Sequence, residues 1–578
     1  MLESLAKIGE LFGEYRPYDR IEGDYVLVLN LKGDEDINKL PQEELKKLIE
    51  LEEFTEEKLE KYFFKKSGTS NPPSWTPTLT LNRKSPEKSL KLSFGRLKEL
   101  ATLGGLNSIN TNLSEETLEK LSEFVKEKLK DIPSKKRVIL TLKIAGRYLG
   151  EIEEIRKGLQ RFLEKRYRER LKPTNGVCAV CKEPKKVYGE GLFPVKFYTL
   201  DKPGFIQGGF KEEAFVFPIC LECGRKLQEG WNFVVENLTF KFVGKIQFHL
   251  IPELVLEDEE KLKWLIEKRL LKSAETVEGL KEEAKRRLAQ DERRIFKRIS
   301  GEGNYFTVHL VFLQKEQQAE RIKLYLYGIY PSRLKKLFEV KDYIDNLLSV
   351  DFNFSTVWEV FGSDLEREFY AYTYHAFRGI PFDENLLLGI ALEKLNETLR
   401  DRESLKTFAE TLKDTLSVYL FSVLSWGGLK MENAECLEKS ETLEGLLNCF
   451  PLLEGETEKA LFLLGALTWK LLQRQEIRLG NKPFLRKLKG LKMTRRDFEN
   501  LYTELVNKLE EYDQIEDYPV LTREVKTLME KVATLMLSAK DWELSTKRAN
   551  FIFACGLGLG EKIFEVLSKE KEKARSAG

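Results

Sequence analysis

Four of the seven cysteines in this 578-residue chain stand in two pairs whose spacing can hold a metal ion. The sequence CAVC contains Cys178 and Cys181. After 38 intervening residues, the sequence CLEC contains Cys220 and Cys223. Two thiolates in a C-x2-C turn can point at one ion, and two such turns complete a tetrahedral zinc site. Because four thiolates leave no open coordination position, we predict one structural Zn²⁺ per chain rather than a catalytic metal.

Turn-forming residues surround both pairs, as a metal-binding turn requires. Pro173 and Gly176 precede the first pair, Pro218 precedes the second, and Gly224 follows it. Two alternatives stay open at this point: a pair of redox-active C-x-x-C motifs, or four unrelated core thiols. The separation between the pairs is longer than in a usual zinc ribbon, so the intervening loop is expected to carry structure of its own.

Other residues suited to catalysis are sparse. The chain has three histidines, none adjacent to an aspartate, and it contains neither a P-loop nor a G-x-S-x-G motif. The glycine-rich stretch CGLGLGEK (555–562) lacks phosphate-loop spacing and is predicted to allow close helix packing. We therefore expect a protein that is not an enzyme. The alternative is a metal-dependent nuclease whose carboxylates come together only in space.

Positive charge is concentrated in three segments of an otherwise balanced chain. Lys and Arg number 96 against 94 Asp and Glu, which excludes a generally basic nucleic-acid coat. Segment 161–172 has a net charge of +4, 285–298 of +5 and 474–496 of +8. Such segregation predicts surfaces for phosphate groups. The residues predicted to contact nucleic acid in these segments are Arg166, Arg168, Arg170, Lys285, Arg286, Arg287, Arg293, Arg294, Arg486, Lys487, Lys489, Arg495 and Arg496.

The hydrophobic pattern that must position these residues predicts an α+β multidomain protein. Its N-terminal and central parts are mixed α/β with an inserted four-cysteine zinc finger, and its C-terminal domain is an all-α helical bundle. The expected regions are an N-terminal α/β domain (1–150), a zinc-finger region with a basic helix (151–250), a central α/β region with a hairpin (251–355) and a helical C-terminal domain (356–578). The individual elements expected include strands at 24–31 and 137–144, helices at 43–66, 114–132 and 151–172, a strand-rich stretch at 232–250 and a hairpin at 305–330.

The sequence also indicates where the protein is located and what kind of organism it comes from. The longest uncharged apolar runs have 12 residues, short of the roughly 20 that a membrane-spanning helix needs. The N-terminal sequence MLESLAKIGELFGEYR has acidic residues and no apolar signal-peptide core, so the expected location is the cytoplasm and no membrane partner is expected. Heavy use of Lys and Glu with few His and Met is typical of thermophile proteins.

One segment resembles a known family. The sequence KFYTLDKPGFIQGGFKEEAFVFPICLECGRKLQEG (196–230) is similar to the large-subunit family of type I-B CRISPR Cascade complexes, in which a YTxDKPGF run precedes the second cysteine pair. SRLKKLF (332–338) and, more weakly, the loop at 67–78 are also similar to that family. The resemblance implies a non-catalytic subunit of an RNA-guided antiviral complex. Such a subunit recognises the protospacer-adjacent motif (PAM) in duplex DNA, assists strand opening and recruits the helicase–nuclease. The implied partners are guide RNA, Cascade backbone subunits, target duplex DNA and the CRISPR helicase–nuclease.

On this resemblance, the loop at 65–84 is the candidate motif reader. Asn71 and neighbouring Ser and Thr side chains are expected to reach base edges. The residues expected to grip the DNA backbone are Lys65, Lys66, Arg83 and Lys84. An ordinary surface loop is the alternative interpretation.

The family also produces separate small subunits by internal translation, which suggests a second product here. Gly427 and Gly428 shortly before Met431 permit a ribosome-binding site in the coding sequence. The product would run from Met431 to Gly578 and is predicted to be a helical bundle that binds a DNA strand and partners the full chain as a small subunit. A zinc scaffold that binds only proteins remains the further alternative for the whole chain.

Overall fold

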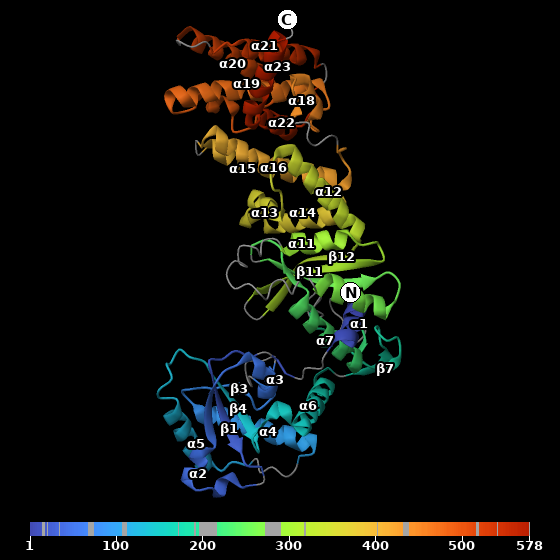
Figure 1. Ribbon diagram of the computed structural model, residues 1–578, viewed down its shortest axis with the longest axis vertical. Helices are drawn as coiled ribbons and strands as arrows, with labels where there is room; N and C mark the ends of the chain where they lie inside the picture. Colours follow the sequence, from blue (N-terminus) through green and yellow to red (C-terminus); the bar gives the residue numbers. More distant parts are fainter. Residues whose placement is uncertain are drawn as a thin grey trace. The chain divides into compact units, whose positions relative to one another are not determined.

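In the computed structural model the chain divides into two compact units, and each is described by itself. Figure 1 labels the helices and strands named below. The N-terminal unit comprises Leu2–Phe233. The C-terminal unit comprises Val234–Gly578 together with Met1. The residues that the structure describes are 1–13, 18–19, 21–33, 35–67, 74–106, 112–171, 173–189, 192–195, 217–244, 246–271, 291–316, 319–400, 403–431, 439–515, 520–539 and 542–576.

A five-stranded sheet forms the centre of the N-terminal unit. Its order is β2 (Ile49–Glu53), β1 (Tyr25–Leu31), β4 (Val138–Ile144) and β3 (Leu79–Thr80), with β5 (Arg147–Tyr148) paired to β4. Strands β1 and β4 run parallel, so the chain between them must cross over the sheet. The apolar run in the middle of β1 is buried throughout, as expected for a strand covered on both faces.

Helices cover this sheet and supply its core. They are α2 (Gln42–Lys47), α3 (Leu59–Tyr62), α4 (Pro86–Gly104), α5 (Glu115–Lys128) and α6 (Glu153–Leu171), with 3₁₀ turns η1 (Ile37–Lys39), η2 (Glu56–Lys58) and η3 (Leu149–Glu151). Leu97 and Leu100 of α4 pack with Leu27 and Leu29 of β1 in one buried cluster. Gly158 of α6 permits the close approach of α4, because a Cβ there would lie 2.0 Å from the Leu100 carbonyl oxygen.

A smaller, three-stranded sheet lies in the second part of the N-terminal unit. Its order is β6 (Thr174–Val177), β7 (Pro184–Tyr188) and β8 (Ile219–Cys220). The chain passes directly from β8 into α7 (Leu221–Asn237), which packs against α1 (Leu2–Phe12). This arrangement brings the two ends of the long loop between the cysteine pairs together.

The C-terminal unit begins with an antiparallel four-stranded sheet. Its order is β12 (Ala319–Ile329), β11 (Phe306–Glu316), β10 (Gln247–Leu254) and β9 (Thr239–Lys241). Phe248 of β10 stacks on Phe296, so this sheet is joined to the helices by aromatic contacts. The helical segments beside this sheet are α8 (Glu259–Leu265), a π-helical turn at Ile266–Leu270, α11 (Asp291–Ser300) and α12 (Pro331–Leu348).

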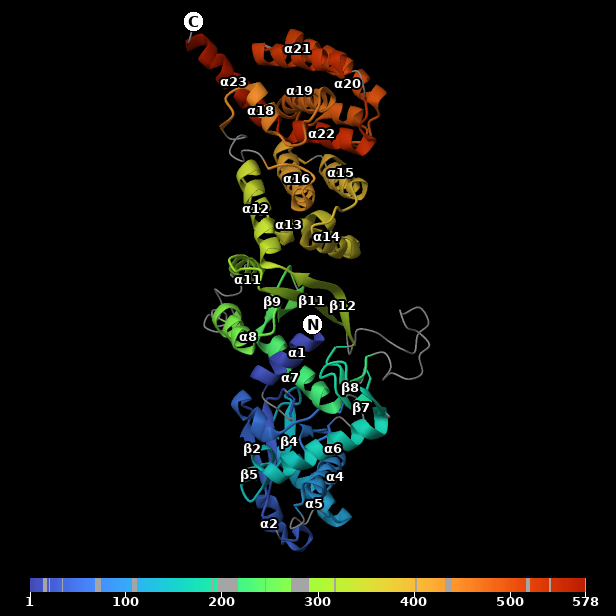
Figure 2. The same ribbon diagram turned by 90° about the vertical axis from the view of Figure 1, so that its right-hand side faces the viewer.

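The rest of the C-terminal unit is helical, as expected, and α19 lies between α21 and α22 (Figure 2). Its elements are α13 (Phe354–Phe361), η9 (Ser363–Leu365), α14 (Glu366–Arg378), α15 (Glu384–Arg400), α16 (Leu405–Trp426), α18 (Leu443–Cys449), α19 (Glu456–Leu479), η10 (Pro483–Leu488), α20 (Arg495–Ile515), α21 (Arg523–Ser538), α22 (Thr546–Gly558) and α23 (Gly560–Ser576). A Cβ on Gly556 would lie 1.7 Å from the Phe462 carbonyl oxygen. The packing role predicted for the glycine-rich stretch is therefore confirmed.

The predicted fold class is confirmed, but two predicted elements are wrong in part. Residues 43–66 do not form one helix, because Ile49–Glu53 pairs with β1 and replaces the helix by a strand. The first residues of the strand-rich stretch at 232–250 belong to α7. The strands and the hairpin expected at 24–31, 137–144 and 305–330 are present. Among the described residues, no helix combines the length and apolar character that crossing a membrane requires.

Candidate metal centre and nucleic-acid contacts

The four predicted ligand cysteines lie together in the N-terminal unit. Cys178 follows β6 and Cys181 precedes β7, while Cys220 ends β8 and Cys223 lies in the first turn of α7. Their four sulfur atoms lie within 4.8 Å of one another. The alternative of four unrelated core thiols is therefore wrong, because the fold brings all four sulfurs to one point.

Backbone hydrogen bonds build the first metal-binding turn. The Lys182 N–H donates to the Cys178 carbonyl (2.9 Å), and the Cys178 N–H donates to the Glu183 carbonyl (2.9 Å). Lys182 adopts a left-handed conformation with φ of 60°, which reverses the chain immediately after Cys181. The Ala179 N–H donates to the Pro218 carbonyl (2.7 Å) and thereby joins this turn to the second one.

The sulfurs also accept hydrogen bonds from the backbone. The Cys220 N–H donates to Cys178 Sγ (3.3 Å), and the Cys223 N–H donates to Cys220 Sγ (3.5 Å). Burial opposes ionisation of Cys178, but backbone N–H donors outweigh it and lower the pKa of its thiol to about 7. Burial raises the pKa of the Cys220 and Cys223 thiols.

Four sulfur donors converging on one point match the ligand set of a tetrahedral metal ion. Three of the four cysteines are buried, so an ion at their centre would be shielded from water. Two redox-active C-x-x-C motifs would not need to lie at the same point, so the convergence of all four sulfurs favours metal binding. Among the described residues, these cysteines form the one group of three or more potential His, Cys, Asp or Glu ligands close enough to hold a metal ion.

Buried contacts hold the described ends of the predicted motif-reading loop. The Trp75 N–H donates to the Lys65 carbonyl (2.7 Å), and the Lys65 N–H donates to Thr76 Oγ1 (3.0 Å). Ser74, which is fully buried, donates from its hydroxyl to the same Lys65 carbonyl (3.1 Å). The base of the loop is therefore a closed hairpin-like stem. Asn71 lies outside the described residues.

The four cations predicted around this loop have different surroundings. Lys65 forms an ion pair with Asp19 (2.7 Å), whereas Lys66 and Lys84 are exposed. The Arg83 guanidinium donates to backbone carbonyls just after α5, including those of Ile132 (2.6 Å) and Pro133 (2.6 Å). Arg83 thus has a structural contact that the sequence did not reveal, and its contact with nucleic acid stays a prediction.

The first basic segment lies against the stem of the loop. Arg166 on α6 places its guanidinium carbon 5.1 Å from the centroid of the Trp75 ring, and Arg96 on α4 lies 5.7 Å from it. Both distances are within the range of cation–π attraction. Arg168 is exposed on the same helix, while the side chain of Arg170 lies outside the described residues. The tertiary structure therefore brings the first basic segment into contact with the stem of the loop at 65–84, although the two lie far apart in the sequence.

The other two basic segments belong to the C-terminal unit. In the second, Arg294 is exposed on α11, whereas Lys285, Arg286, Arg287 and the side chain of Arg293 lie outside the described residues. In the third, the predicted residues lie in the connection between α19 and α20 and at the start of α20. Those exposed there are Arg486, Lys487, Lys489, Arg495 and Arg496.

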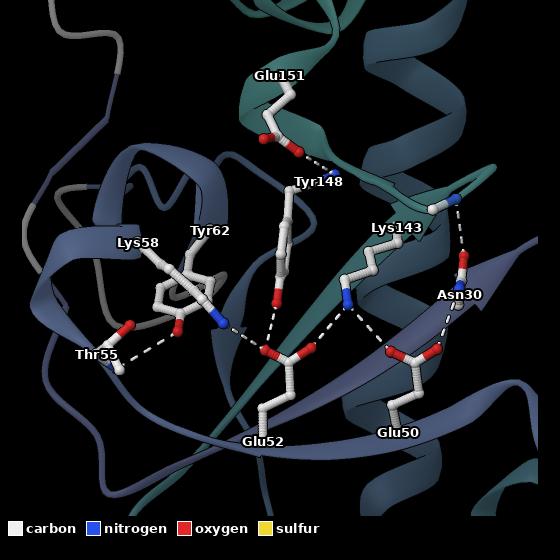
Figure 3. Close-up of polar contacts among 10 residues, drawn as sticks. Asn30, Glu50, Glu52, Thr55, Lys58, Tyr62, Lys143, Tyr148 and Glu151 are labelled. Atoms are coloured by element: carbon white, nitrogen blue, oxygen red, sulfur yellow. Dashed lines mark hydrogen bonds and ion pairs between the residues drawn. The ribbon is translucent and has the colours of Figure 1, made fainter.

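A polar network on the N-terminal sheet was not anticipated from the sequence (Figure 3). The Glu52 carboxylate accepts hydrogen bonds from Lys143 (2.7 Å), Tyr148 (2.6 Å) and Lys58 (2.9 Å). Lys143 also donates to Glu50 (3.0 Å). Burial opposes the charged form of Glu52, but these donors outweigh it and lower its pKa to about 2. The network attaches the turn at Lys58, shortly before the loop stem, to the sheet.

The three histidines make separate local contacts. His309 is buried and lies between Glu253 (2.6 Å) and the Tyr325 hydroxyl (2.9 Å). Burial lowers its pKa. His249 contacts the Thr239 hydroxyl (2.7 Å), and His375 contacts the Pro381 carbonyl (2.6 Å). The three histidines thus contact different residues and do not share a partner in these hydrogen bonds.

Family models of three consecutive domains match nearly the whole chain. The N-terminal domain of the CRISPR-associated protein TM1802 (cas_TM1802) matches residues 1–161, its central domain 175–329 and its C-terminal domain 352–572. The chain belongs to the CRISPR-associated TM1802 family. Curated proteins yielded no match. In this TM1802 protein the central-domain match begins just before Cys178 and includes both cysteine pairs, so the resemblance drawn from residues 196–230 is confirmed.

Proposed function

We propose that this TM1802-family protein is the non-catalytic large subunit of a type I-B, RNA-guided Cascade complex in the cytoplasm. It binds the PAM in duplex DNA, assists strand opening and recruits the helicase–nuclease for antiviral defence. Its partners are guide RNA, the backbone subunits, target duplex DNA and that helicase–nuclease. The observation that carries the proposal is the match of three consecutive TM1802 domains along one chain.

The loop at 65–84 is our proposed reader of the DNA motif. A reader must hold its side chains in one place before DNA arrives, because ordering a loose loop reduces affinity. The stem closed by Lys65, Ser74 and Thr76 fixes the described ends of the loop, and Trp75 lies within cation–π distance of Arg96 and Arg166. Exposed Lys66 and Lys84 at either side are available to the DNA backbone, which positions the loop without reading sequence.

The four-cysteine cluster is proposed to hold one structural Zn²⁺. Four thiolates suit zinc, whose tetrahedral S₄ sites support folding and leave no position for a substrate. The ion would join the turn after β6 to the start of α7, and so close the long loop between the cysteine pairs. The chain's own contribution is to supply backbone N–H donors to the sulfurs and to exclude water.

Met431 is proposed as the start of a separate small subunit. It lies in the connection between α16 and α18, so a product beginning there would contain complete helices from α18 to α23. Expression of the gene with an in-frame Met431→Leu codon change should remove a fragment ending at Gly578. Failure to detect that fragment from the unaltered gene would contradict internal translation.

The test of the proposed function uses the complex purified with its guide RNA. Duplexes with randomised bases beside the guide-matched sequence should be enriched for one short motif. The variant Lys66→Glu/Lys84→Glu should bind duplexes that carry this motif more weakly, because the DNA backbone loses two positive partners, whereas Lys88→Glu/Lys91→Glu, with the same charge change on exposed positions of α4, should bind them as the unaltered complex does. A chain that purifies without guide RNA would overturn the proposal. DNA cleavage by the isolated chain with magnesium or manganese would favour a nuclease.

A further inference from the structure

A cavity of about 610 Å³ opens in the C-terminal unit at the end of α15. One wall comes from the last turn of α15, including Asn396 and Arg400. The other comes from the connection between α19 and α20, residues 480–492. Its volume lies within the range of small-molecule sites.

The lining of this cavity carries positive charge and no carboxylate. Its cationic side chains are Arg400, Lys482, Arg486, Lys489 and Lys492. Three of them face acidic partners outside the lining, at distances of 3.2 Å (Arg400 to Glu393), 2.8 Å (Lys482 to Glu476) and 2.6 Å (Lys489 to Asp497). Arg486 and Lys492 are exposed and form no ion pair with any described residue. These two cations are available to an anionic ligand.

Buried anchors hold the cationic connection rigidly. Phe484 and Leu488 are buried, and the Phe484 N–H donates to the buried Gln475 side chain (3.0 Å). At the far end, the fully buried Asn550 accepts from the Met493 N–H (3.0 Å) and donates to the Met493 carbonyl (2.8 Å). The cations between these anchors are thus arranged before a ligand arrives, which reduces the entropic cost of binding.

The backbone beneath the cavity is strained. Lys489, Gly490 and Leu491 are consecutive and all adopt positive φ angles of 49°, 61° and 57°. Such conformations are unfavourable for the two non-glycine residues and persist only where the surrounding structure imposes them. A side chain at Gly490 would come within 3.1 Å of the Asn396 amide, so glycine keeps this wall of the cavity in place.

We propose that this cavity binds one nucleoside phosphate unit. The phosphate group of this ligand is bound by Arg486 and Lys492, because arginine and lysine form strong, charge-assisted hydrogen bonds with phosphate oxygens. Leu399, Pro483 and Leu485 in the lining offer apolar surface to the sugar and base, which a bare phosphate would not use. This inference deepens the nucleic-acid contact predicted for Arg486 by naming a cavity and a ligand, and it is tested on the chain alone, without guide RNA or other subunits.

Two sources can supply this chemistry: one nucleotide of a single strand, or a free nucleotide. The test measures binding of a fluorescein-labelled oligo(dT) strand to the full-length chain, with ATP and inorganic phosphate as competitors. A strand as the source predicts that ATP competes only weakly. A free nucleotide as the source predicts strong competition by ATP but little by inorganic phosphate. Either result supports binding of a nucleoside phosphate and identifies which of the two sources supplies it.

The decisive variant, Arg486→Glu/Lys492→Glu, reverses the charge at the two cationic positions that are available to the ligand. Binding of the preferred probe should weaken by about tenfold or more, because the phosphate loses its charged ligands. If a strand is bound, a plot of the logarithm of the binding constant against the logarithm of the salt concentration should become less steep by about 0.7, because one phosphate contact is lost. The matched control Arg523→Glu/Lys526→Glu makes the same charge change at exposed positions of α21 and should weaken binding much less.

A second variant separates a seated nucleotide from general attraction to charge. Leu485→Trp fills the cavity without changing its charge, and it should weaken binding about as much as the charge reversal. Equal losses in the charge reversal and its control would overturn the proposal, as would unchanged binding by Leu485→Trp. Far-ultraviolet circular dichroism and thermal unfolding must match the unaltered chain for each variant. Because no other subunit is present, failure here leaves the proposed function standing.

Discussion

The Arg166 guanidinium lies 5.1 Å from the centroid of the Trp75 ring, and this contact joins a basic helix to the stem of the candidate motif-reading loop. Phe162 takes part in the same contact, because its ring centroid lies 5.2 Å from that of Trp75 and 5.5 Å from the Arg166 guanidinium. The exposed Arg166 side chain therefore lies within cation–π distance of two aromatic rings.

Trp75→Ala should lower the free energy of unfolding of the N-terminal unit by about 2 kcal/mol, because it removes a partly buried aromatic side chain and its cation–π contacts. Urea unfolding followed by circular dichroism measures the change. Trp75→Phe should cost less than half as much, since it retains an aromatic face. Equal losses for both variants would contradict a stabilising role of the aromatic face at this position.

Cys220→Ser should remove the bound metal. The purified chain should contain about one zinc ion, and the variant close to none, because three sulfurs no longer complete the tetrahedral site. Its unfolding temperature should fall by about 10 °C or more, since metal-binding energy contributes to folding. Metal content is measured by elemental mass spectrometry. Cys555→Ala, which changes a buried cysteine in the C-terminal unit, should keep its zinc.

Glu52→Gln should reduce stability at neutral pH but not in strong acid. The pKa of Glu52 falls from 4.5 to about 2 in the folded protein, so its carboxylate stabilises the fold above pH 4.5. That contribution is lost as the pH falls through about 2, where the folded form also binds a proton. The difference in unfolding temperature between the two proteins should therefore shrink across this window. A constant difference would contradict the ionic role of Glu52.

Asn550→Leu should destabilise the C-terminal unit by about 3 kcal/mol, because it leaves the buried N–H and carbonyl of Met493 without partners. Chemical denaturation followed by tryptophan fluorescence provides the measurement. Asn385→Leu is the control, since this asparagine is exposed on α15 and the same substitution there should change little. A small effect at Asn550 would mean that water replaces the lost amide.

Two glycine-to-alanine changes should have opposite signs. Gly556→Ala places a methyl group 1.7 Å from the Phe462 carbonyl and should destabilise the contact of α19 with α22 by several kcal/mol, about 3 or more. Gly95→Ala, at an exposed position of α4, meets no atom within 4 Å and should stabilise the fold by about 0.5–1 kcal/mol. Thermal unfolding compares both with the unaltered chain. Similar shifts in the same direction would contradict the packing argument.

Local patterns were reliable where the structure depends on residues close in sequence. The C-x2-C pairs, the hairpin and the C-terminal helices were all predicted, because their geometry follows from spacing and from the period of apolar residues. The helix expected over 43–66 failed for the opposite reason. Ile49 and Leu51 pair with β1, and this long-range pairing outweighs the helical preference of the surrounding Glu and Lys residues.

The sequence by itself determined the ligand chemistry of the cysteines, the helical character of the C-terminal part and the location of the basic segments. Only the tertiary structure decided which distant residues meet: β1 beside β4, Arg166 on Trp75, Arg83 just after α5, and Arg400 in the lining of the same cavity as Arg486. The physical reason is the range of the interactions. A turn is specified by neighbouring residues, whereas the partner of a guanidinium depends on the packing of the whole unit.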